Sequence, residues 1–105
     1  MYKESISKTS ELFSKVGNIN LNDVAAVFGN TSNQSVLADL KKCIVALIDF
    51  LKEEASYDDI MRAYDDVSKA IDTANLTGLI GQNEAADYYK YVDDIWASIE
   101  KEKVT

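Results

Sequence analysis

The chain has 105 residues, of which 47% are hydrophobic and 10% aromatic. This composition supplies the core of one domain spanning residues 1–105, and it excludes a disordered chain. The net charge is −7, and most of the excess lies in residues 57–105. A field of that sign disfavours nucleic acids and anionic membranes as partners and favours basic ones.

The residue types that catalysis usually needs are absent. The sequence has no histidine, which removes the usual general base, the commonest metal ligand and the simplest pH sensor. It also has no nucleophile elbow and no glycine-rich phosphate loop. We therefore expect neither an enzyme nor a bound cofactor or metal.

The cysteine content and the hydropathy of the chain indicate the cellular compartment in which we expect the protein. Cys43 is the only cysteine and lies in an apolar run, so we expect a buried, unreactive side chain, and one unpaired cysteine fits a reducing cytoplasm. No signal peptide opens the chain, and its longest apolar stretch is far too short to span a bilayer. The expectation is a cytoplasmic protein that does not cross a membrane.

The absence of proline permits long helices, and apolar spacing locates them. The first is predicted over residues 4–16, where Thr9 fills a gap in the apolar stripe and Gly17 ends the helix. Residues 21–28 predict either a short extra helix of two turns or an ordered loop. Residues 29–33, rich in Gly, Asn, Ser and Thr, predict a loop.

The next two helices are strongly amphipathic. One is predicted over residues 34–54, and its apolar face is so broad that we expect it to be the central helix of the fold. The other follows Ser56, which with Asp59 resembles a capping box. Its apolar seam has 3-4 spacing and consists of Tyr57, Ile60, Tyr64, Val67, Ile71 and Ala74.

The last helix follows a turn at residues 76–82, beneath which Leu79 and Ile80 are expected to tuck. Asn83 is the predicted cap, and Trp96 is expected in the core. Tyr91 is expected on the outward face, and an exposed tyrosine beside charged residues is typical of interfaces. Four helices with short connections predict an all-α, antiparallel four-helix bundle.

Acidic residues recur along the third predicted helix. Asp58, Asp65 and Asp72 are seven residues apart, which places them on one face at intervals of about 10 Å. That separation is too long for carboxylates to share a metal ion. The spacing therefore indicates a solvated acidic face rather than a metal site.

Three stretches, together about two thirds of the chain, resemble the immunity proteins of class IIa (pediocin-like) bacteriocins. They are the leucine-rich helix beginning near Leu37, the helix that starts at Tyr57, and the turn at residues 74–80. This turn leads through the polar pair Asn83-Glu84 into a last helix with tyrosines. The chain departs from the family in charge, because many members are basic.

The resemblance implies a cytosolic four-helix bundle that protects a producing cell from its own bacteriocin. Such proteins act at the bacteriocin-bound mannose phosphotransferase permease and block the pore, and their specificity is associated with the C-terminal half. Carried onto this chain, the partner-binding residues are Thr77, Leu79, Ile80, Asp87, Tyr91 and Asp94. The alternative is an acidic helical inhibitor or adaptor of the nucleic-acid-mimic type, which binds a basic intracellular partner.

Overall fold

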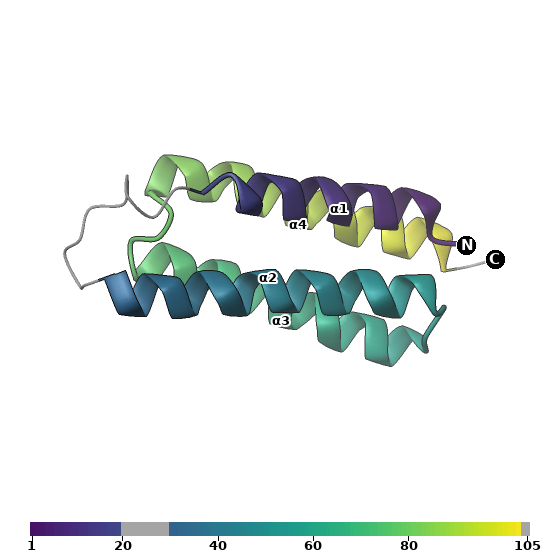
Figure 1. Ribbon diagram of the computed structural model, residues 1–105. Coiled ribbons are helices and arrows are strands. Elements are labelled where there is room, and N and C mark those ends of the chain that lie inside the picture. The colour runs from purple at the N-terminus through teal and green to yellow at the C-terminus, as the bar shows by residue number, and fades with distance from the viewer. Residues whose placement is uncertain (20–29, 104–105) are drawn as a thin grey trace.

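The computed structural model describes residues 1–19 and 30–103, with the backbone alone for residues 30–33. This part of the chain forms four helices: α1 (Lys3–Gly17), α2 (Asn30–Lys52), α3 (Tyr57–Leu76) and α4 (Gln82–Glu102). The helices alternate in direction, so the N-terminus, the α2–α3 turn and the end of α4 lie together (Figure 1). The predicted all-α, antiparallel four-helix bundle is confirmed. The extra helix or loop predicted at residues 21–28 lies outside the described residues.

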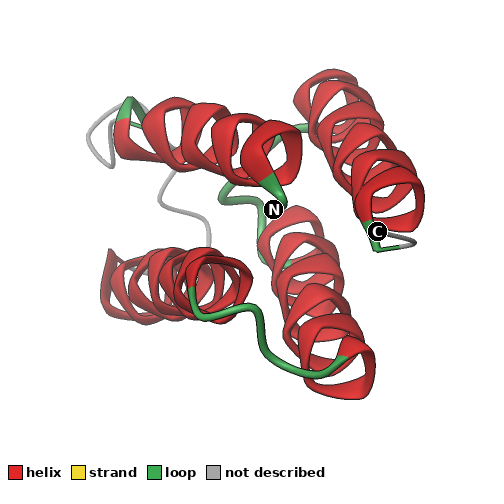
Figure 2. Cartoon of the chain, turned by 90° about the vertical axis from the view of Figure 1, so that its right-hand side faces the viewer, coloured by secondary structure: helices red, strands yellow, loops and turns green. Residues whose placement is uncertain are grey.

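Seen end-on, the helices occupy the corners of a square (Figure 2). In the described part of the chain, α1 and α3 each pack on both α2 and α4. The expectation that the second long helix is central was therefore wrong. Each helix has two neighbours and one outward side, and on α2 that side leaves Val45 42% exposed.

The core consists of apolar side chains at 3-4 spacing, the pattern that keeps one stripe of a helix facing its neighbours. On α2 these residues are Leu37, Leu40, Ile44, Leu47 and Leu51, and on α3 they include Ile60, Val67, Ile71 and Ala74. Tyr57, predicted as the first residue of the α3 seam, is instead 37% exposed. It lies in the first turn of α3, at the end of the bundle, where less of the neighbouring helices covers it.

The prediction that Trp96 lies in the core was also wrong, because its side chain is 46% exposed. Ile95 and Ile99 are fully buried and hold the inward positions of α4. Successive residues of a helix point about 100° apart, so Trp96 is turned away from the stripe that Ile95 occupies.

The beginning of α3 follows its sequence signal. Ser56 Oγ accepts a hydrogen bond from the Asp59 N–H at 3.2 Å, so the predicted N-cap is confirmed. A side-chain oxygen in this position satisfies one of the N–H groups that the first turn of a helix leaves without a partner.

Two other helix starts differ from prediction. Residues 30–33 belong to α2 rather than to a loop, because asparagine, serine and threonine cost only about 0.5 kcal/mol each inside a helix and a stable helix extends through them. The last helix begins at Gln82, so Asn83 is not its cap. Instead the Glu84 carboxylate reaches back and accepts a hydrogen bond from the Gly81 N–H at 3.3 Å.

The α3–α4 turn closes one end of the core. Gly78 has a φ of 81°, a left-handed conformation that favours glycine because other residues strain there. The Ile80 N–H then donates to the Ala74 carbonyl at 3.2 Å. Leu79 and Ile80 are tucked beneath the turn as predicted, with 3% and 1% of their surfaces exposed.

Candidate functional site

A groove between α1 and α4 gathers three of the six residues predicted to bind a partner. Asp87, Tyr91 and Asp94 are four and three residues apart on α4, which places them on one face. Two residues of α1 contribute the opposite wall. The complete lining is Glu11, Lys15, Asp87, Lys90, Tyr91 and Asp94.

The lining of the groove is almost entirely charged. It offers three carboxylates, two ammonium groups and one phenol, with no nucleophile beside a base. Charged groups of both signs at a partly open site select a partner by electrostatic complementarity.

Lys15 organises the aromatic part of the groove. Its Nζ lies 5.3 Å from the centroid of the Tyr88 ring and 5.9 Å from that of Tyr91. A cation over a ring face at such distances stabilises the pair by about 0.5–1 kcal/mol at a partly exposed site. Tyr91 was predicted to be exposed, but it is half-buried, because α1 brings Lys15 to its ring.

Tyr88 forms the buried floor beside this groove and is 2% exposed. Burial, the Glu84 carboxylate and the neighbouring Tyr91 together raise the pKa of Tyr88 to about 12. The phenol is therefore protonated at neutral pH, and its role is to pack rather than to transfer a proton.

The other three predicted residues lie in the α3–α4 turn and do not line the groove. Leu79 and Ile80 are buried in the core, which leaves them almost no surface to offer a partner. The turn folds both side chains inward, and their role in binding a partner stays a prediction. Thr77 is half-buried, and its hydroxyl donates to the Ala74 carbonyl at 3.3 Å.

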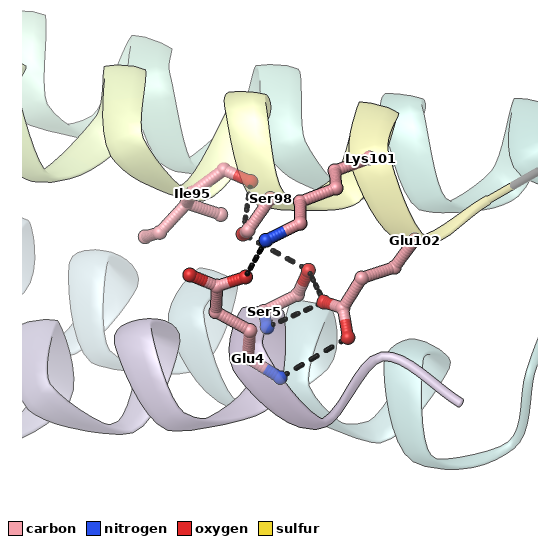
Figure 3. Close-up of polar contacts among 6 residues, drawn as sticks. All are labelled: Glu4, Ser5, Ile95, Ser98, Lys101 and Glu102. Carbon is pink, nitrogen blue, oxygen red and sulfur yellow. Dashed lines mark hydrogen bonds and ion pairs between the residues drawn. The ribbon is translucent and has the colours of Figure 1, made fainter.

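A polar clasp, made of Ser5, Ser98 and Glu102, holds the two walls of the groove together at the other end of α1. Tyr2, the residue before α1, has a left-handed backbone with a φ of 61°, and its side chain makes no capping hydrogen bond. The Glu102 carboxylate takes that role from α4, accepting hydrogen bonds from the N–H groups of Glu4 at 3.2 Å and Ser5 at 2.8 Å (Figure 3). The end of one helix thus caps the beginning of another.

The clasp continues inward through two buried hydroxyls. Ser5 Oγ lies 2.6 Å from Glu102 Oε1 and 3.0 Å from Ser98 Oγ, while Ser98 Oγ donates to the Ile95 carbonyl at 2.8 Å (Figure 3). A hydroxyl has one hydrogen, and the carboxylate is the stronger acceptor for that of Ser5. Because these residues are small, α1 and α4 approach closely, and each buried hydroxyl still has a hydrogen-bond partner.

The protonation of Glu102 reflects these bonds. Partial burial raises its pKa, but the hydrogen bonds from Ser5 and Glu4 and the positive N-terminus together outweigh burial and leave the pKa below its ordinary value. The carboxylate is therefore ionised at neutral pH and stabilises the contact between α1 and α4 in that form.

Sequence reasoning missed the clasp. Ser5 and Glu102 are 97 positions apart, and no local pattern connects them. The available signal was weaker: Ser5 and Thr9 precede Leu12 and Val16 at 4-3-4 spacing, and all four are buried. A stripe that begins with small polar residues indicates a close helix contact, but it does not identify the partner.

A second groove lies between α2 and α3 and contains Cys43. The thiol is half-buried rather than fully buried as predicted. Its burial, with the nearby carboxylates of Asp66 and Asp39, raises the pKa of Cys43. The thiol is therefore a weak nucleophile at neutral pH.

Two further observations concern the part of the chain that the structure describes. No three histidine, cysteine, aspartate or glutamate side chains there are close enough to hold a metal ion. None of its helices is both long and apolar enough to cross a membrane.

The chain is acidic, and the part that the structure describes is an all-α bundle with a charged groove between α1 and α4. No protein-family model, curated protein or solved structure matches the chain.

Proposed function

We propose that the protein is a bacteriocin immunity protein, which protects a producing cell by binding the bacteriocin–receptor complex from the cytosolic side. The four-helix bundle agrees with the fold that the resemblance to the class IIa family implies. The observation that carries the proposal is the α1/α4 groove, in which Asp87, Tyr91 and Asp94 of the C-terminal half come together.

The groove supplies suitable contacts for such a role. Asp87 and Asp94 are exposed and offer carboxylates to basic groups of the complex, where charge-assisted hydrogen bonds are the strongest polar contacts. Tyr91 between them adds an amphipathic ring that Lys15 holds in place. A rigid aromatic side chain flanked by charge is a common energetic centre of protein interfaces.

The test is resistance. Expressing the chain inside a sensitive Gram-positive host should protect it against a narrow set of bacteriocins from a broad panel. The groove variant D87N/D94N should lose most of that protection. The matched control D49N/E53Q removes the same charge from exposed positions outside the groove and should retain it. Lack of protection against every peptide of the panel would refute the proposal.

The second candidate function is an acidic inhibitor or adaptor of the nucleic-acid-mimic type. The observation that favours it is the row of Asp58, Asp65 and Asp72, all exposed along α3. The protein would then displace a labelled duplex from a basic DNA-binding protein, with an effect that collapses at moderate salt. Changing the three aspartates to asparagine should abolish displacement, whereas D87N/D94N should not.

A further inference from the structure

The seam between α3 and α4 carries a row of aromatic side chains, on the opposite side of α4 from the α1/α4 groove. Three tyrosines donate hydrogen bonds across this seam: Tyr57 to the Glu100 carboxylate, Tyr64 to the Val92 carbonyl at 3.3 Å, and Tyr89 to the Asp72 carboxylate. Each phenol thus uses its polar end to join the two helices and leaves its ring along the seam.

Trp96 belongs to the same row. It follows Val92 by four residues and precedes Glu100 by four, and helical residues four apart share a face. Trp96 therefore lies on α4 between the points where Tyr64 and Tyr57 bond. It is 46% exposed and Tyr57 is 37% exposed, so large aromatic surfaces remain open to solvent here.

Carboxylates lie beside the middle of this row. Asp93 precedes Trp96 by one helical turn, and Asp65 lies next to Tyr64 on α3; both are exposed. Burial, followed by the charges of Asp93 and Asp65, raises the pKa of Tyr64 to about 12. Both carboxylates therefore act on the middle of the seam.

A lysine of the chain itself, Lys103, already binds at this seam and indicates what kind of group the surface can bind. The Lys103 ammonium lies 4.2 Å from the centroid of the Tyr57 ring and forms an ion pair with Glu100. An ammonium group over a ring with a carboxylate beside it is the arrangement that a basic partner would repeat at Trp96, with Asp93 and Asp65 as counter-charges.

We propose that the aromatic–acidic seam, defined as Tyr57, Tyr64, Trp96, Asp65 and Asp93, docks a basic amphipathic helix of a partner protein. The apolar side of that helix contacts the Trp96 and Tyr57 rings, and its lysines or arginines pair with Asp65 and Asp93. A helix laid along two packed helices can present its apolar side to the exposed rings, as amphipathic recognition helices do.

Charge distinguishes this occupant from others. A second copy of the chain carries the same net charge of −7 and would set like charges against each other, and nucleic acid or an anionic membrane would be repelled. The seam goes beyond the proposed function, because it shares no residue with the α1/α4 groove and can be tested without a bacteriocin. It shares only Asp65 with the acidic row of α3.

Trp96 is the only tryptophan of the chain, so its fluorescence reports on the seam without a label. The probe is a tryptophan-free helical peptide of about five turns, with leucines at i, i+3, i+4 and i+7 and lysines elsewhere. A matched peptide carries glutamate in place of lysine. Titrating the full chain with the basic peptide should shift the Trp96 emission to the blue and saturate, whereas the acidic peptide should cause no shift.

Variants identify the residues involved. D65N/D93N should weaken binding of the basic peptide by about 10-fold or more, since truncating central interface residues has effects of that order. The control D49N/E53Q should bind as the unchanged chain does. W96A, followed by calorimetry and verified as folded by circular dichroism, should also lose binding.

Several results would overturn the docking of a basic helix. They are no emission shift with the basic peptide, equal binding of both peptides, or W96A binding with unchanged affinity. A blue shift caused by lipid vesicles alone would assign the seam to a membrane surface, and one that grows with protein concentration alone would assign it to self-association. None of these results depends on whether the chain confers bacteriocin resistance.

Discussion

Replacing Glu102 with alanine tests whether the end of α4 caps the beginning of α1. The carboxylate accepts hydrogen bonds from the Glu4 N–H, the Ser5 N–H and Ser5 Oγ. Without it, the first turn of α1 loses its acceptor, since Tyr2 provides no capping hydrogen bond from its side chain. The α1–α4 contact should therefore weaken at the end of the bundle where α1 begins and α4 ends.

The magnitude follows from those bonds. Removing a helix cap costs about 1 kcal/mol, and hydrogen bonds to a charged group contribute about 1.5–3 kcal/mol each when water cannot replace them. Glu102 is partly exposed, so water replaces part of the loss. We expect E102A to lower the free energy of unfolding by about 2 kcal/mol and Tm by about 8 °C for a chain of this length.

Urea denaturation at several pH values measures the effect, with E102Q as the second variant. The pKa of Glu102 is lowered in the folded state, so its ionised form stabilises the fold above the unfolded pKa of about 4.3. That contribution is lost as the pH falls through the folded pKa. The difference between the unchanged chain and E102Q should therefore be largest near neutral pH and should shrink as the pH falls below the unfolded value and through the folded pKa.

Glu53 provides the matched control, since it is exposed and E53Q should change the free energy of unfolding by less than about 0.5 kcal/mol. The capping role would be refuted if E102A and E53Q had the same stability at pH 7. It would also fail if the E102Q difference did not change with pH.

Three further predictions concern other features of the fold. G78A should lower the free energy of unfolding by about 1–2 kcal/mol in urea denaturation, because Gly78 has a φ of 81°; no loss would contradict this. Cys43 should react with a thiol reagent at pH 8 more slowly than free cysteine, because its pKa is raised. Tyr64 and Tyr88 should ionise near pH 12 in an ultraviolet titration. Their folded pKa exceeds the unfolded value of about 10, so their contribution to stability is lost as the pH rises through that interval.

Packing explains which of the predicted partner-binding residues lie close together. Asp87, Tyr91 and Asp94 could be grouped from the sequence because all three lie on one helix, where spacing fixes the shared face. Glu11 and Lys15, on the opposite wall, could not be assigned, because nothing local states that α1 packs on α4. The same reason hid the clasp between Ser5 and Glu102.

Local chemistry was enough to place the helices. Ser56 caps α3 as its spacing to Asp59 predicted, Gly17 ends α1, and the 3-4 stripes on α2 and α3 are buried. Helix formation and the choice of an inward face depend on neighbours three and four residues away. A single sequence therefore indicates where the helices lie and which stripe faces inward, whereas the first turns of α2 and α4 differed from prediction.

The tertiary structure decided how exposed the residues beside each buried stripe are. Trp96 and Tyr91 both lie beside the inward positions of α4, yet Trp96 is exposed on the α3 side while Tyr91 is half-covered on the α1 side. Whether a border residue is covered depends on the side chain that the neighbouring helix presents, here Lys15 over Tyr91. The sequence determined an acidic four-helix bundle, and packing determined which aromatic residues remain open to a partner.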